Sequence, residues 1–142
     1  MNGTELRPDQ HKLIPTPEHR AVRVLVVNDY PDNVASMALL LRLYGHEVAV
    51  ALGGAAALRV AQAQQPDAVL LDISMPGMDG YQVARQLRAM YRDSLLLLIA
   101  ITAHGFEEDR RRCEEAGFDR HLVKPADPLA VEHLLRELGQ SL

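Results

Sequence analysis

The sequence predicts a doubly wound α/β fold in which five parallel strands form one open sheet. From Val22 onward, short apolar runs alternate five times with stretches of helical periodicity. The run 95–101 is apolar at every position, as a strand that is covered on both faces must be. The chain has 142 residues. It is therefore much shorter than an eight-unit barrel of about 250 residues, and the open sheet is favoured.

The first βα unit shows how the elements are assigned. The β-branched stretch 22–27 predicts a buried strand, which a polar turn ends. Pro31 suits the first turn of a helix, and Asp32 suits the positive end of the helix dipole. We therefore expect a helix over 32–43 that stops at Gly45.

The same alternation continues through four more units. Asp79, with Gln82 three residues later, resembles a capping box at the start of a helix. Acidic residues at 107–109 open the next helix, and Asp127 with Pro128 caps and starts the last one. The expected strands are 47–51, 68–71, 95–101 and 120–123, and the helices between them end near Gln64, Met90 and Gly117.

Composition narrows the class of protein. A hydrophobic content of 48% suits one domain with a proper core. Nineteen acidic against fifteen basic residues give a net charge of −4, so no sequence-wide basic field exists to hold nucleic acid or an anionic membrane. The one cysteine, Cys113, can form no internal disulfide, and the start of the chain lacks a secretory pattern. These features favour a cytoplasmic protein.

Two further segments bear on organisation. Residues 1–20 mix charges with three prolines and show no periodicity, so we expect a flexible leader before a domain at 21–142. The longest apolar run is far below the roughly 18–20 residues that a membrane-spanning helix needs. We therefore expect no membrane span.

Polar residues follow four of the five predicted strands: Asn28 and Asp29, then Asp72, Thr102 and Lys124. In open α/β sheets a site forms beyond the carboxyl ends of the strands, so these side chains should converge. Two nearby carboxylates repel unless a cation intervenes, and hard oxygen ligands with an open position favour Mg²⁺, which bridges to phosphate. Lys124 can neutralise a phosphoryl oxygen, and Thr102 can donate to one.

Each of these residues has an ordinary alternative interpretation. An aspartate after a strand is usually a turn residue or a cap, a lysine before proline is usually surface charge, and a threonine can be a turn hydroxyl. Their convergence at one edge of the sheet favours the phosphoryl site over these separate roles.

The motifs LVVND, LLDISMPGMDG, IAITAH and HLVKP, in this order and spacing, resemble the receiver domain of bacterial response regulators and hybrid sensor kinases. The resemblance covers about Val22 to Leu138. It implies a flavodoxin-like (βα)₅ fold with strand order 2-1-3-4-5. It also implies Mg²⁺-dependent phosphoryl transfer to Asp72 from a histidine kinase or a histidine phosphotransfer protein.

The same resemblance implies roles for individual residues. Asp29, Asp72 and the backbone carbonyl of Ser74 would hold Mg²⁺. Lys124 would pair with the acyl phosphate, and Thr102 would swing inward to bond it. His121 stands where the family often carries an aromatic residue whose inward rotation follows the threonine. The Lys124–Pro125 bond is expected to be cis by resemblance.

Asn28 departs from the family, which usually has two acidic residues after the first strand. Asn28 therefore lacks the negative charge that a carboxylate at this position would place near the metal ion. We predict weaker Mg²⁺ binding, with phosphorylation retained. Asn28 is also the only residue that favours an alternative function. In that alternative the chain is a pseudo-receiver, which acts as a protein-binding module without being phosphorylated. A flavin or nucleotide carrier is less well supported, because the loop after the first strand is acidic rather than rich in Gly, Ser or Thr.

The expected activity is limited to the chain's own phosphorylation and dephosphorylation. The sequence suits either a stand-alone receiver or a piece of a hybrid kinase, and it leaves a homodimer and the downstream protein partner open.

Overall fold

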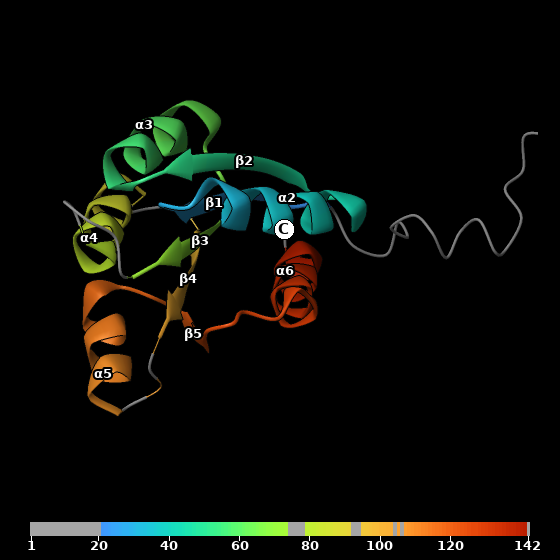
Figure 1. Cartoon of the computed structure of the whole chain (residues 1–142). Coiled ribbons are helices and arrows are strands. Elements are labelled where there is room, and N and C mark those ends of the chain that lie inside the picture. The colour runs from blue at the N-terminus through green and yellow to red at the C-terminus, as the bar shows by residue number, and fades with distance from the viewer. Residues whose placement is uncertain (1–20, 74–78, 92–94, 104, 106, 142) are drawn as a thin grey trace, which may run out of the picture.

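The computed structural model describes residues 21–73, 79–91, 95–103, 105 and 107–141. The elements are β1 (Arg23–Asn28), α2 (Pro31–Leu43), β2 (Glu47–Leu52), α3 (Gly54–Gln64), β3 (Ala68–Asp72), α4 (Gly80–Met90), β4 (Leu97–Thr102), α5 (Glu107–Ala116), β5 (Arg120–Val123) and α6 (Pro128–Ser141). All neighbouring strands are parallel, in the order β2-β1-β3-β4-β5 (Figure 1). The predicted fold class and strand order are confirmed.

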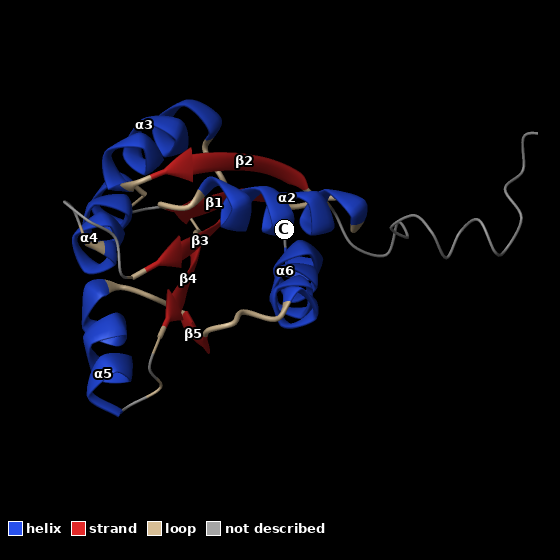
Figure 2. Ribbon diagram, in the orientation of Figure 1, coloured by secondary structure: helices blue, strands red, loops and turns tan. Residues whose placement is uncertain are grey.

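Helices cover both faces of the sheet, and each face has its own core. Helices α3, α4 and α5 pack on one face, and α2 and α6 pack on the other (Figure 2). Leu71, Leu87 and Leu98 are fully buried in the first core, and Leu41 and Leu135 in the second. Burying one such side chain stabilises a fold by about 1.5–3 kcal/mol. Every residue of β3 is buried, so the end of this strand is held rigidly at the centre of the sheet.

Helix starts follow the local signals in the sequence. The N–H of Gln82 donates to Asp79 Oδ1 at 2.9 Å, and the Gln82 side chain accepts from the Asp79 N–H at 3.2 Å, which confirms the capping box. Asp127 Oδ1 accepts from the N–H of Leu129 at 3.0 Å at the start of α6, as predicted. Helix α2 begins at Pro31, one residue before the predicted start. No helix in the described part of the chain is long and apolar enough to cross a membrane.

Strand β4 corrects one predicted boundary. The sequence predicts a strand over 95–101, but β4 spans Leu97–Thr102. Leu95 lies outside the sheet and is 67% exposed. The carbonyl of Leu96 accepts from Arg88 Nη1 at 2.8 Å. The apolar run therefore starts before the strand does, because a side chain from α4 takes the carbonyl at its entrance.

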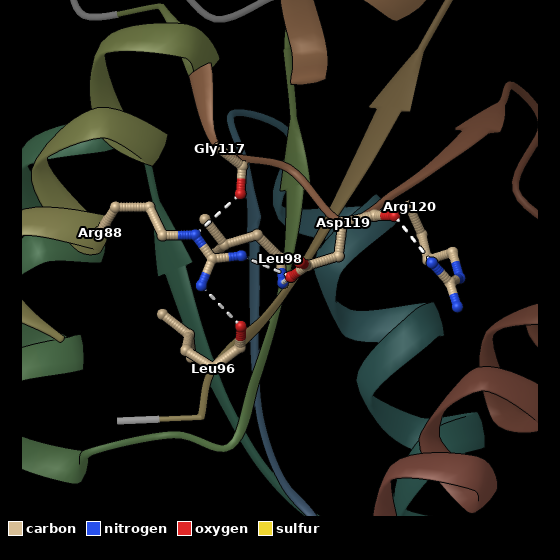
Figure 3. Close-up of polar contacts among 6 residues, drawn as sticks. All are labelled: Arg88, Leu96, Leu98, Gly117, Asp119 and Arg120. Atoms are coloured by element: carbon tan, nitrogen blue, oxygen red, sulfur yellow. Dashed lines mark hydrogen bonds and ion pairs between the residues drawn. The ribbon is translucent and has the colours of Figure 1, made fainter. Parts of the chain in front are cut away.

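Arg88 joins α4 to the amino ends of β4 and β5. Its Nε donates to the carbonyl of Gly117 at 2.8 Å, and its Nη2 donates to the Asp119 carboxylate (Figure 3). The same carboxylate accepts from the N–H of Leu98 at 2.8 Å. Gly117 has φ +106°, and a Cβ there would lie 2.7 Å from Arg88 Cγ, so only glycine fits this turn. We call these contacts of Arg88 the Arg88 network; it lies at the edge of the sheet opposite to the predicted site.

Candidate phosphoacceptor site

Asp72 and Lys124 form an ion pair at the carboxyl edge of the sheet. Asp72 ends β3 and is 3% exposed. Lys124 follows β5 and places Nζ 2.9 Å from Asp72 Oδ2. Removing a carboxylate from water is costly, and an ammonium group at this distance offsets much of that cost. The structure thus joins two of the predicted site residues directly.

The backbone of Lys124 is fixed beside the end of β4. Its N–H donates to the carbonyl of Thr102 at 2.7 Å, one step beyond the pairing of Thr102 with Val123. The Lys124–Pro125 peptide bond is cis, as expected from the resemblance. The backbone of Lys124 is therefore fixed at the end of β5, and its side chain extends past the end of β4 to Asp72 on β3.

Asn28 and Asp29 lie at the end of β1, and their polar atoms have different surroundings. Asn28 Oδ1 accepts from the N–H of Tyr30 at 3.0 Å, which forms a local turn leading into α2. Asp29 Oδ2 is buried and has no hydrogen-bond partner in the described part of the chain. A buried carboxylate oxygen without a donor destabilises the fold. This oxygen is therefore suited to a cation or to the waters that a cation carries.

The donor set at this edge fits Mg²⁺. Asp29 and Asp72 supply two carboxylates, and Mg²⁺ typically takes one or two carboxylates and keeps several waters. Among the described residues, no group of three or more His, Cys, Asp or Glu side chains could form a fuller protein cage for a metal ion. Ser74, whose carbonyl the family resemblance adds to this set, lies outside the described residues.

Thr102 and His121 make the second contact among the predicted site residues. Thr102 ends β4 and is 5% exposed, and its Oγ1 lies 3.0 Å from Nε2 of His121 on β5. His121 pairs in register with Ala100, two residues before Thr102. The family resemblance gives both residues a role, but the hydrogen bond between them was not predictable, because no local signal in the sequence connects side chains on separate strands.

A groove of about 570 Å³ opens beside the ion pair, between α2 and the segment that follows β5. Asp72 and Lys124 line it together with Met37 and Leu40 of α2 and Pro125. The lining around the ion pair is largely apolar. The groove gives a bound group access to the buried carboxylate along the side of α2, and the sequence did not indicate it.

Gly80 is a further residue that positions the site. A Cβ at this position would lie 2.7 Å from Cα of Ile73 and 3.0 Å from the carbonyl oxygen of Asp72. The N–H of Gly80 also donates to the carbonyl of Ile73 at 3.0 Å. The start of α4 therefore packs directly on the backbone at the carboxyl end of β3. The glycine directly after the Asp79 cap was the available signal for this close approach.

Comparisons with known proteins fit this geometry. The sequence model of one protein family, the response regulator receiver domain, matches residues 24–136 of this chain. The chain is 46% identical over 123 residues to the transcriptional regulatory protein PrrA of Mycobacterium tuberculosis, which covers 84% of this chain and 52% of PrrA. It is 38% identical over 109 residues to the sensor histidine kinase GacS of Pseudomonas protegens, covering 75% of this chain and 12% of GacS.

A solved structure has the same fold. The receiver domain of the Saccharomyces cerevisiae response regulator Ssk1, co-crystallised with the histidine phosphotransfer signaling protein Ypd1, matches with a TM-score of 0.79 and 22% identity. The match covers 85% of this chain and 90% of that one.

The chain spans about half the length of PrrA and a small part of GacS. The family match nevertheless covers most of the chain and includes Asp29, Asp72, Thr102, His121 and Lys124. The chain therefore belongs to the response regulator receiver domain family of two-component signalling.

Proposed function

We propose that this chain accepts a phosphoryl group on Asp72 from the phosphohistidine of a histidine kinase or a histidine phosphotransfer protein, in a Mg²⁺-dependent reaction. The observation that carries the proposal is the ion pair of Lys124 Nζ with the buried Asp72 carboxylate at 2.9 Å. Membership of the receiver family supports the reaction class. The similarity to GacS, a sensor histidine kinase, supports the kind of partner.

The reaction makes one bond and breaks one bond. A carboxylate oxygen of Asp72 attacks the phosphorus, the P–N bond to the donor imidazole breaks, and its electron pair returns to the ring nitrogen. The product on this chain is an acyl phosphate. Lys124 then neutralises a phosphoryl oxygen, and the hydroxyl of Thr102 donates to another. Catalysis of this kind rests on positioning and charge neutralisation.

Asp29, Asp72 and the carbonyl of Ser74 would hold the Mg²⁺. When bound, the ion would neutralise the negative charge of the transferring phosphoryl group. Oδ2 of Asp29 supports this assignment, because it is buried and has no hydrogen-bond partner among the described residues. Asn28 adds no charge to the set, and its Oδ1 accepts from the N–H of Tyr30. We therefore expect weaker metal binding than two acidic residues after β1 would give.

The proposed activity ends at the chain's own phosphorylation and dephosphorylation, with signalling through contact with a downstream protein in the cytoplasm. PrrA and GacS extend well beyond the matched region. The proposed chemistry of Asp72 is the same whether this chain signals alone or as part of a longer protein.

Intact-mass spectrometry after incubation with acetyl phosphate and Mg²⁺ tests the proposal. We expect a single phosphoryl adduct on the wild-type chain and none on Asp72→Asn or after chelation of the metal. Glu115→Gln removes an exposed carboxylate from α5 and is the matched control, which should form the adduct as the wild type does.

A wild-type chain that forms no adduct with acetyl phosphate or with a phosphorylated histidine donor, even at high Mg²⁺, would overturn the proposal. The alternative would then be a receiver fold that binds a protein partner without phosphorylation. An adduct that persists in Asp72→Asn would contradict the assignment of the acceptor residue.

A further inference from the structure

The hydrogen bond between Thr102 and His121 joins the site to the surface of β5. The backbone of Thr102 is fixed, because its carbonyl accepts from the N–H of Lys124 at 2.7 Å. Its side chain is held separately, with Oγ1 3.0 Å from Nε2 of His121. The backbone contact can persist while the side chain turns about χ1, so the two contacts need not break together.

We propose that His121 is a positioning residue, which holds the Thr102 hydroxyl in the unphosphorylated state and must release it before the hydroxyl can bond a phosphoryl group on Asp72. This inference rests on the proposed function. It gives His121 a role that a phenylalanine in the same place could not have, because a hydrocarbon ring has no nitrogen to bond the hydroxyl.

The physical argument is one of competition between two positions of one hydroxyl group. A phosphoryl group can draw the hydroxyl inward only by as much as it binds the inward state better than the outward state. The bond to His121 stabilises the outward state and so reduces the apparent affinity for the phosphoryl group. A typical side-chain hydrogen bond has a net value that corresponds to about a three- to tenfold change in affinity.

The released ring has room to move. His121 lines a cavity of about 420 Å³ between α5 and β5, with Cys113, Phe118 and Val123 among the other lining residues. When the hydroxyl leaves, the imidazole loses the contact that orients it toward the site.

The test measures the affinity of beryllofluoride, a phosphoryl mimic, in the presence of Mg²⁺ by fluorine NMR titration. His121→Phe keeps a ring but removes the hydrogen bond, and it should bind beryllofluoride about three- to tenfold more tightly than the wild type. His121→Gln carries an amide that can reach the same hydroxyl and should restore the wild-type affinity. Both variants are repeated with Thr102→Val, which removes the hydroxyl and keeps the side-chain shape.

In the Thr102→Val background the effect of His121→Phe should disappear, because no hydroxyl remains to be held. An unchanged affinity in His121→Phe, or the same change with and without the hydroxyl, would overturn the inference while wild-type binding left the proposed function intact. A wild-type chain that binds no beryllofluoride, or binds it equally well as Asp72→Asn, would instead overturn the proposed function and this inference with it.

Discussion

At the residue scale, the site combines polar atoms that already have partners with one that has none. Lys124 contacts Asp72, and Asn28 Oδ1 accepts from the N–H of Tyr30. Asp29 Oδ2 is buried without a hydrogen-bond partner in the described part of the chain. This oxygen belongs to a carboxylate, so a cation would satisfy it. Asn28 supplies turn geometry and no charge.

Replacing Asn28 tests how much the missing charge matters. Asn28→Asp keeps an oxygen that can accept from the N–H of Tyr30 and adds a carboxylate near the metal. We expect Mg²⁺ to bind about tenfold more tightly, because a carboxylate about 5 Å from a divalent ion adds attraction even in water-like surroundings. Calorimetric titration with Mg²⁺ measures the change. Asn28→Ser, which keeps an acceptor without charge, is the control, and equal affinities for Asn28→Asp and wild type would contradict the prediction.

Cys113 is the second residue that leads to a testable prediction, through the pKa of its thiol. It is 1% exposed between α5 and the sheet. Burial raises the pKa of its thiol above the usual 9.0, and the charge of Asp109 adds to the rise, while a hydrogen bond with Tyr81 acts in the opposite direction. Desolvation by burial is the largest cause of the raised pKa.

This raised pKa predicts a loss of stability in alkali. The folded chain keeps the thiol proton more tightly than the unfolded chain does, so the contribution is fully present below about pH 9 and declines as pH rises through the folded value. We expect the free energy of unfolding to fall by at most about 1.4 kcal/mol per pH unit from this group, and Cys113→Ala to show a shallower fall.

Urea unfolding between about pH 8 and 9.5 is the measurement. The range stops there because burial also raises the pKa values of Tyr81 and Tyr91 above 10.0, and these groups add their own slopes at higher pH. Parallel curves for Cys113→Ala and the wild type would count against the assignment. The comparison uses slopes, since the smaller side chain also leaves a cavity that lowers stability at every pH.

At the element scale, the ends of the helices and strands are set by contacts of two kinds. The capping contacts of Asp79 and Asp127 come from residues next to the helix. The entrance of β4 and the turn before β5 are set instead by Arg88, which reaches them from α4. The fork of the guanidinium group allows one side chain to bond two carbonyls and a carboxylate at once.

Removing this fork should destabilise the fold without touching the chemistry of Asp72. We expect Arg88→Ala to lower the free energy of unfolding by about 2–3 kcal/mol, a discounted value because the Arg88 side chain is 30% exposed. Arg85→Ala, an exposed arginine on the same helix, should change it by less than about 0.5 kcal/mol. Denaturant unfolding measures both variants.

Arg88→Lys keeps the charge and loses the fork, so it should fall between the wild type and Arg88→Ala. Phosphorylation by acetyl phosphate should be retained in all these variants under native conditions. Equal stabilities for Arg88→Ala and Arg85→Ala would show that the network does not hold these elements.

The same distinction explains which features could be predicted from the sequence. The elements, their order, the capping box at Asp79 and the cap at Asp127 were predictable, because apolar periodicity and capping signals act over a few residues. The placement of Asp72 and Lys124 at one edge followed from strand ends in a parallel sheet. The start of β4 and the bond between Thr102 and His121 depend on side chains that meet across separate elements, so no short pattern encodes them.

At the scale of the whole molecule, the last helix is tied to the entrances of the first two strands by a buried polar contact. His46 and Glu132 are 4% and 7% exposed and are bonded to each other through Nε2 and Oε1. Nδ1 of the ring accepts from the N–H of Val22 at 3.1 Å, so the ring proton lies on Nε2 and is donated to the carboxylate. This contact connects the entrances of β1 and β2 with α6, beside the apolar packing of Leu135. It gives His46 a structural role at the base of the sheet.

The pairing of Asp72 with Lys124 also has a consequence for the order in which the protein is made. The carboxylate belongs to the third strand, and its ammonium partner arrives 52 residues later, after the last strand has been synthesised. A nascent chain that closed its sheet around Asp72 before that moment would bury the negative charge without the ammonium, which disfavours early closure. The last strand therefore completes the edge of the sheet and brings the ammonium partner of Asp72 in the same step, so the proposed acceptor site is complete only once the last strand is in place.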